Sequence, residues 1–257
     1  MDFSIAGILM LDGATNGAIY ALLALALVLI FAVTRVIFIP QGEFVAYGAL
    51  TLAMIQNGSP VGSPWQRWGD LPGTVWLLCV LALLAAGLDA WRARRGGTPW
   101  PAIGRGAGRT LAVPMAVLAL TAIGSPRSWP LWGQGLLTLA IVAPLGPLVY
   151  RLAYEKLADA SVLVLLIVSV GVHFTLTGLG LVFFGAEGFR NPSFWDQRFS
   201  AGPLVLSGQT LIIFMVSAAL ILALALFFEH TLRGKALRAT AVNRLGARLM
   251  GISTTAA

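Results

Sequence analysis

The sequence predicts an all-α fold, a polytopic bundle of about seven transmembrane helices. Of its 257 residues, 58% are hydrophobic and 11% are charged, whereas a soluble domain carries about 25% charged residues. Several apolar runs reach about 18 residues with almost no charge, the length that a helix needs to cross a bilayer core. A membrane barrel would show polar and apolar residues in alternation, which these runs lack. The chain is therefore predicted to be an integral membrane protein.

The predicted spans follow from the apolar runs in chain order. They cover residues 13–33, 36–56, 74–90, 111–124, 134–152, 161–185 and 205–228. A loop rich in Pro, Gly and Trp separates the second span from the third, and an arginine-rich segment, residues 91–109, separates the third from the fourth. Residues 1–228 are thus predicted to form the membrane bundle, and the polar residues 229–257 a cytoplasmic segment.

The distribution of basic residues orients the predicted bundle. With seven crossings, one side holds Arg35, Arg92, Arg94, Arg95, Arg105, Arg109, Arg151, Lys156, Arg233, Lys235, Arg238, Arg244 and Arg248, and the other holds Arg67, Arg127, Arg190 and Arg198. Because cytoplasmic loops collect Lys and Arg, the C-terminus is predicted inside and the N-terminus outside. The N-terminus lacks the basic start of a cleaved signal peptide, so the first apolar run is expected to be retained.

Composition and motifs argue against several classes of function. The net charge of +7 is explained by basic cytoplasmic loops, so no nucleic-acid partner is predicted. The sequence contains none of the common hydrolase, metalloprotease or nucleotide-binding motifs, and Cys79 is its single cysteine. We therefore predict no catalytic residue and no metal site in this chain.

His173 is a polar residue inside the sixth predicted span. Ser169 and Thr177 lie one helical turn away on either side, an arrangement that an intramembrane serine hydrolase would also need. Two further interpretations remain open: a histidine that bonds a neighbouring helix, and a histidine that lines a polar path.

The first predicted span begins with small and polar residues. Gly13 and Gly17 form a Gly-x-x-x-Gly pattern, which allows two helices to approach closely. Thr15 and Asn16 lie between them and are candidates for helix packing or for contact with a substrate.

The segment from Arg35 to Phe44 places a carboxylate at the entry to the second span. Glu43 would cost roughly 2.5 to 3.5 kcal/mol at the bilayer centre, so it should face a cavity, a partner or the interface. Pro40 and Gly42 predict a bent or broken helix entry, and transporters place substrate sites beside broken helices. The alternative is a turn at the membrane surface in which Arg35 pairs with Glu43.

The polar tail predicts a short cationic amphipathic helix. Leu237, Ala241, Leu245 and Leu249 recur every four residues, and Gly251 is a helix-ending residue. Such a helix can lie on anionic lipid or dock into a groove of a cytoplasmic partner.

Four motifs together resemble a known family. They are Asn-Gly-Ala-Ile-Tyr-Ala-Leu at residues 16–22, the Gln-Gly-Glu-Phe of residues 41–44, Leu-Val-Tyr-Arg-Leu-Ala-Tyr at residues 148–154, and Gly-Lys-Ala-Leu-Arg-Ala with Asn-Arg and Ala-Arg-Leu-Met-Gly-Ile between residues 234 and 252. In this order they are similar to branched-chain amino-acid ABC transporter permeases of the LivH type.

The resemblance implies a multi-pass subunit of the bacterial inner membrane that imports branched-chain or related amino acids. Its implied partners are a second permease subunit, two cytoplasmic ATPases that hold ATP and Mg, and a periplasmic substrate-binding protein. It implies that Arg233–Ile252 is the segment that couples to the ATPase, with candidate contacts at Arg233, Gly234, Leu237, Arg238, Asn243, Arg244, Arg248 and Gly251. The candidate substrate path comprises Thr15, Asn16, Gln41, Gly42, Glu43 and His173.

The sequence departs from the family pattern in three places. The usual wording before Gly-Glu is Asn-Phe-Ala-His, and here Phe38, Ile39, Pro40 and Gln41 stand instead. Leu245 and Gly246 replace a usual Glu-Ala. Relatives continue with further spans, so a fragment, or a bundle completed by another chain, is expected. The competing prediction is a stand-alone channel or a proton-coupled carrier, in which Glu43 and His173 would titrate.

Overall fold

The computed structural model describes residues 3–58, 71–96, 100–124, 126–158, 160–201 and 204–251. The predicted all-α class is confirmed, and six of the described helices are long and apolar enough to cross a membrane. They lie within Ile5–Thr34, Gly73–Arg95, Gly104–Ile123, Leu131–Leu157, Val162–Phe184 and Gly208–His230. The helix in the second predicted span, α2 (Gln41–Asn57), has 17 residues, which is at the lower limit for a crossing.

The chain divides into two compact units. Unit 1 comprises Met1–Phe38 and Ser193–Ala257, and unit 2 comprises Ile39–Pro192. Most of the predicted loop between the second and third spans, residues 59–70, and the end of the tail, residues 252–257, fall outside the described residues.

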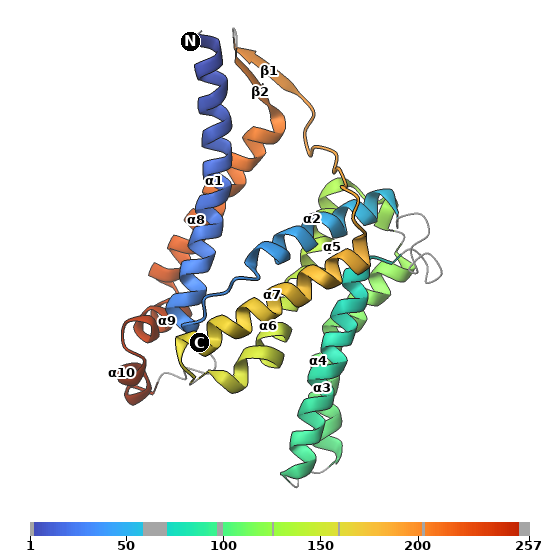
Figure 1. Cartoon of the computed structure of the whole chain (residues 1–257), viewed down its shortest axis with the longest axis vertical. Helices are drawn as coiled ribbons and strands as arrows, with labels where there is room; N and C mark the ends of the chain where they lie inside the picture. Colours follow the sequence, from blue (N-terminus) through green and yellow to red (C-terminus); the bar gives the residue numbers. More distant parts are fainter. Residues whose placement is uncertain are drawn as a thin grey trace. The chain divides into compact units, whose positions relative to one another are not determined.

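In unit 1, α1 (Phe3–Thr34) and α8 (Gly208–His230) lie side by side; they are the blue and orange helices of Figure 1. The short strands β1 (Arg198–Ala201) and β2 (Leu204–Ser207) pair antiparallel just before α8. The side chain of Ser207 caps α8 by accepting a hydrogen bond from Thr210 N at 3.1 Å. Almost no side chain of α1 and α8 is buried, and apolar helices with such accessible surfaces suit contact with lipid or with other membrane helices.

Unit 1 also contains the tail. α9 (Leu232–Val242) follows α8 after one residue, and α10 (Arg244–Leu249) follows α9 after one residue. The single amphipathic helix predicted here is wrong, because the backbone is extended at Asn243 and the Asn243 side chain caps α10 by accepting from Gly246 N at 2.9 Å. The predicted apolar stripe is interrupted as a result, and Leu249 at its end is 80% exposed.

The described residues of unit 2 form five helical passes that alternate in direction, of which all but α2 are long and apolar enough to cross a membrane. They are α2, α3 (Gly73–Arg95), α4 (Trp100–Ile123), the pass that begins with α5 (Leu131–Val142), and α7 (Val162–Phe184). Arg127, after α4, donates to Asn57 O at the end of α2, and Arg151 pairs with Asp89 near the end of α3. α3 and α4 run side by side as a hairpin (Figure 1).

The α5 pass is irregular. After α5 the chain turns at Ala143 and Pro144 and continues as α6 (Leu145–Val149), the π-helix η3 (Tyr150–Tyr154) and the 3-10 turn η4 (Glu155–Leu157). Prolines at 144 and 147 lack the N–H that a regular helix requires, which accounts for the departure from α geometry.

Several helices begin or end at residues other than those predicted for the spans. α1 starts ten residues before Gly13, and α3 and α4 extend into the arginine-rich segment that was predicted as a connection. A helix can extend beyond the apolar part of its span, because its internal backbone hydrogen bonds remain satisfied in water as well. α2, in contrast, starts only at Gln41, because Pro40 precedes it with φ −66° at the N-cap position.

The core of unit 2 is apolar. Its fully buried members include Met54, Val75, Leu78, Ile141 and Phe184, which come from α2, α3, α5 and α7. Two threonine hydroxyls are also buried, and Thr51 Oγ1 of α2 lies 2.5 Å from Thr74 Oγ1 of α3. The core therefore holds together the passes on which the candidate site lies.

Candidate functional site

The candidate site is built around Glu43, in the first turn of α2. A carboxylate in this position is favoured by the partial positive charge of a helix N-terminus. Because α2 begins directly after Pro40, the Glu43 side chain lies at the start of a regular helix and not within a broken one. Its side chain is 16% exposed, so it is largely removed from solvent.

Two side chains of α7 meet the Glu43 carboxylate. His173 Nδ1 lies 2.8 Å from Glu43 Oε1, and the Thr177 hydroxyl donates to the same oxygen at 3.2 Å. Thr177 Oγ1 also lies 2.9 Å from the carbonyl oxygen of His173. The structure therefore brings together two predicted path residues, Glu43 and His173, that are 130 positions apart in the chain. The predicted alternative partner, Arg35, belongs to the other unit.

The contact between His173 and Glu43 is close but is not aligned as a hydrogen bond. Nδ1 of His173 is buried and has no hydrogen-bond partner of good geometry. The pair is thus held by charge when the imidazole is protonated. A carboxylate, an imidazole and a hydroxyl in this arrangement can bind a cationic or hydrogen-bonding group of a small solute.

The arrangement does not favour the serine hydrolase interpretation. Ser169 is fully buried, and its hydroxyl lies 3.0 Å from the Tyr154 hydroxyl of η3. The Ser169 side chain is therefore committed to a helix–helix contact, one turn before His173 on α7.

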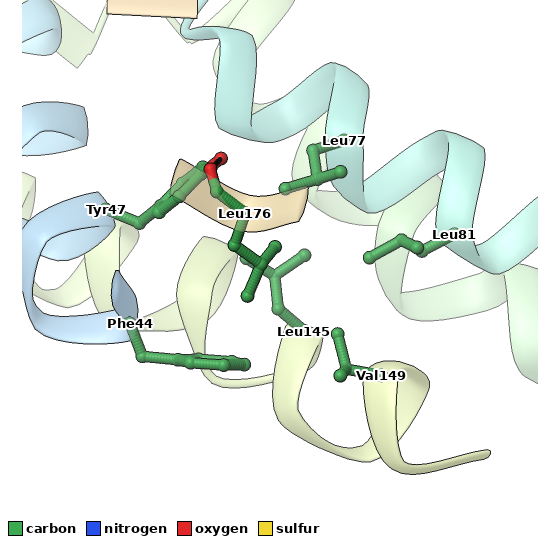
Figure 2. Close-up of a pocket in the computed structure, with 7 residues that line it drawn as sticks. All are labelled: Phe44, Tyr47, Leu77, Leu81, Leu145, Val149 and Leu176. Carbon is green, nitrogen blue, oxygen red and sulfur yellow. Dashed lines mark hydrogen bonds between the residues drawn. The ribbon is translucent and has the colours of Figure 1, made fainter. Parts of the chain in front are cut away.

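Apolar side chains line the inner side of the site. Tyr47, one turn after Glu43, donates its hydroxyl proton to Leu176 O at 2.8 Å and packs edge-to-face on Phe184. Figure 2 shows Tyr47 and Phe44 of α2 converging with leucine and valine side chains of α3, α6 and α7 around a small cavity of about 10 Å³. Such a space scarcely accommodates one water molecule and has no free polar group in its lining, so it is part of the packing.

A larger groove adjoins this small cavity and shares Leu77, Leu81, Val149 and Leu176 with it. Its volume is about 420 Å³, and its lining comes from α3, α6, η3 and α7. Thr175 is the one polar side chain in this lining, and its hydroxyl already donates to Gly171 O at 2.8 Å. The groove therefore presents an apolar wall.

The other predicted path residues are distributed over both units. Gln41 and Gly42 lie in the first turn of α2, next to Glu43. Thr15 and Asn16 lie on α1 in unit 1, where the Thr15 hydroxyl donates to Leu11 O at 2.8 Å. No described atom lies within 4 Å of a Cβ built on Gly13 or Gly17, so the close helix approach predicted at these glycines is not seen among the described contacts.

The predicted coupling residues lie on α9, α10 and the turn after α10. Gly234 is packed against the end of α8, where an added Cβ would lie 2.7 Å from Phe228 Cα. Arg233 and Arg238 are exposed and Leu237 is half-buried. Gly251 has φ +79°, as expected for a glycine that ends a helix. The side chains of Arg244 and Arg248 fall outside the described residues.

A charged cluster near the end of α3 was not predicted. Asp89 pairs with Arg151 of η3, and Arg92 lies 3.9 Å from Asp89 and 3.7 Å from Glu155. The available signal was an aspartate at the end of an apolar run with an arginine three residues later.

Comparison with known proteins gives matches over part of the chain. Residues 9–92 match the family model described as branched-chain amino acid transport system / permease component. The high-affinity branched-chain amino acid transport system permease proteins LivH of Salmonella typhimurium and of Salmonella typhi are each 27% identical to the chain over 146 residues, which is 54% of this chain and 47% of theirs. The chain thus spans about half the length of these relatives. No solved structure gives a match of comparable significance.

The family match covers α1, α2 and most of α3, and it includes Glu43. The resemblance to branched-chain amino-acid transport permeases that the sequence motifs predict is therefore confirmed, as a distant relationship that covers about half of the chain.

Proposed function

We propose that the chain is a membrane-spanning permease subunit of an ATP-binding cassette importer for branched-chain or related amino acids. The observation that carries this proposal is the family match over residues 9–92, which includes Glu43. The structure adds that this largely buried carboxylate faces His173 of α7. LivH of Salmonella typhimurium is by its name a branched-chain amino acid permease, and we extend this cargo class to the present chain.

The proposed substrate path contains groups for both ends of a zwitterion. Glu43 supplies an acceptor for the substrate ammonium. Thr177 and His173 both contact its Oε1 atom, which leaves its Oε2 atom for the ammonium. The Gln41 side chain is proposed as a donor toward the carboxylate, and Gly42 leaves room beside the helix, since no described atom lies within 4 Å of a Cβ built there. The aliphatic side chain of the substrate would pack against apolar side chains of the helices.

The tail is proposed to couple the bundle to an ATPase. Thr231 ends α8 and caps α9 by accepting from Gly234 N at 2.9 Å, which fixes the direction in which α9 leaves the membrane helix. Four apolar residues of the tail are each at least 80% exposed: Leu232, Val242, Leu249 and Met250. The arginines of α9, Arg233 and Arg238, are exposed as well. An exposed surface of this mixed character favours docking to a protein partner.

The proposed mechanism is alternating access without covalent chemistry in this chain. ATP and Mg would be bound by the two ATPases, and a second permease and a periplasmic binding protein would complete the transporter. Movement of α9 and α10 with the ATPases would exchange outward-facing and inward-facing states. The proposed location is the bacterial inner membrane, with the N-terminus outside and the C-terminus cytoplasmic.

A proton-coupled carrier is the second candidate, and the Glu43–His173 pair favours it, since such pairs serve as proton relays in carriers. ATP dependence separates the two functions. The chain would be co-expressed with the ATPase and second permease of its transporter, and uptake of labelled L-leucine would be measured into right-side-out vesicles that are filled with ATP and supplied with the binding protein outside. Uptake that requires ATP supports the importer, whereas uptake driven by a proton gradient without ATP supports the carrier.

A further inference from the structure

His173 lies where a cationic group of a substrate would have to bind. Its Nδ1 atom is 2.8 Å from Glu43 Oε1, and the Thr177 hydroxyl holds the same oxygen from the same helix. The imidazole is covalently part of the chain, so its effective concentration beside the carboxylate is high whenever α2 and α7 are packed together.

We propose that His173 is a specificity-determining residue: when protonated it occupies Glu43 as an internal cation, and when neutral it releases the carboxylate to a cationic group of the cargo. Protons and cargo thus compete for one carboxylate. The cargo part of this inference rests on the proposed function, whereas the pairing of the two side chains does not.

Several charged groups on neighbouring elements pair with groups other than Glu43 and His173. Near the start of α7, Asp89 and Arg92 of α3 pair with Arg151 and Glu155. Arg127 binds Asn57 O at the opposite end of α2, about 20 Å from Glu43 along the helix. The segment after α7 carries Glu187 and Arg190 and meets α2 through Asn191, which donates to Ala49 O at 3.0 Å.

The hydroxyl groups near the pair are also engaged. Tyr47 donates to a backbone carbonyl of α7, and Tyr154 lies in hydrogen-bond contact with Ser169. Among the described residues, His173 is the titratable side chain that the structure places in contact with the Glu43 carboxylate.

The direction of the effect follows from the charges. When the imidazole carries a proton it is the counter-ion of the carboxylate, and the cargo must displace it. Protonation of His173 therefore lowers the apparent affinity for a cationic or zwitterionic cargo. A neutral imidazole has no charge to pair with Glu43 and leaves the carboxylate available.

The first experiment tests the pair without any cargo. The thermal midpoints of the purified chain in detergent are compared for the wild type, His173→Gln, Glu43→Gln and the double variant at about pH 5.5 and about pH 7.5. At the lower pH, the decreases in thermal midpoint of the two single variants should add up to about 2–4 °C more than the decrease of the double variant. At the higher pH this difference should vanish. His230→Gln, the change at the second histidine, should show no coupling to Glu43→Gln. An equal coupling at both pH values, or none at either, overturns the inference.

The second experiment adds the cargo. In the assembled transporter, the KM for L-leucine uptake should rise at least about fivefold between the two pH values, and His173→Gln should remove most of this rise. His230→Gln should keep it. A full rise in the His173→Gln variant overturns the inference. Absence of leucine uptake in every form, with the pH-dependent coupling intact, contradicts the proposed function and leaves the pair established.

Discussion

At the scale of single residues, the central finding is the environment of Glu43. The sequence shows Gln41 at the position where the resembled family usually has histidine, so an imidazole near Gly42 and Glu43 was not expected from α2. The structure places one there from α7. Both residues could be predicted as candidates because each is an ionisable group in an apolar run. Their contact could not be predicted, since it depends on how α2 and α7 pack.

A buried hydroxyl pair gives a prediction at the same scale. Thr51 and Thr74 are fully buried, their hydroxyl oxygens are 2.5 Å apart, and Thr51 in turn donates to Tyr47 O. Thr51→Val leaves the Thr74 hydroxyl without an acceptor and should destabilise the chain by about 1 to 3 kcal/mol.

Unfolding in detergent measures this change, and Thr51→Ser serves as the matched control because it keeps the hydroxyl. Since the penalty comes from an orphaned group, the double variant with valine at both positions should cost less than the sum of the single changes. Strict additivity would show that the two hydroxyls do not interact.

At the scale of helices, local sequence signals explain where several elements begin and end. Pro40 precedes α2, Ser161 and Ser207 cap α7 and α8, and Gly251 follows α10 in the left-handed conformation. The π-helix η3 and the break at Asn243 were not predicted, because apolar periodicity alone contains no information about a local change of helix type.

The contact between α3 and α7 requires a glycine. A Cβ built on Gly73 would lie 2.6 Å from Phe183 Cβ, so Gly73→Ala must push the two helices apart and should cost about 1 to 3 kcal/mol. Gly48→Ala on α2 is the control, because no described atom lies within 4 Å of its Cβ and alanine favours a helix. Equal unfolding midpoints of the two variants would show that Phe183 does not limit the space beside Gly73.

The turn between α8 and α9 gives a second prediction for an element. An alanine at Gly234 would place its Cβ against the backbone of Phe227 and Phe228, so α9 must change its direction. In the assembled transporter, Gly234→Ala should reduce ATP-dependent uptake at least about tenfold, while the amount of chain in the membrane falls much less. Ala236→Gly, two residues away on α9, tests whether a change of helix propensity in α9 alone alters uptake. Unchanged uptake in Gly234→Ala would show that the angle between α8 and α9 does not matter for coupling.

At the scale of the whole molecule, the composition predicted the class of protein well. High hydropathy and rare charges predict membrane helices on physical grounds alone, and six described helices meet the length and composition required. Composition alone does not give the number of crossings, because α2 carries Gln41, Glu43 and Gln56 and is only 17 residues long. The alternating directions of the five passes in unit 2 are consistent with a crossing by α2.

The single cysteine makes the predicted orientation directly testable. A Cys79→Ser chain lacks thiols, so one cysteine can be placed at Ser4, at Glu187 or at Thr231. With seven crossings and the C-terminus inside, a thiol reagent that does not cross the membrane should label positions 4 and 187 in intact cells. Position 231 should be labelled only after the membrane is opened. Labelling of all three positions in intact cells would contradict the predicted topology.

The most direct test of the account is the dependence of uptake on both ATP and Glu43. Vesicles with the assembled transporter are assayed for labelled L-leucine uptake with and without ATP, in the wild type, in Glu43→Gln and in Glu187→Gln as an exposed control. We predict ATP-dependent uptake that Glu43→Gln lowers about ten- to a hundredfold, the value of a hydrogen bond to a charged group, and that Glu187→Gln leaves intact. ATP-dependent uptake that is equal in the two variants would contradict it.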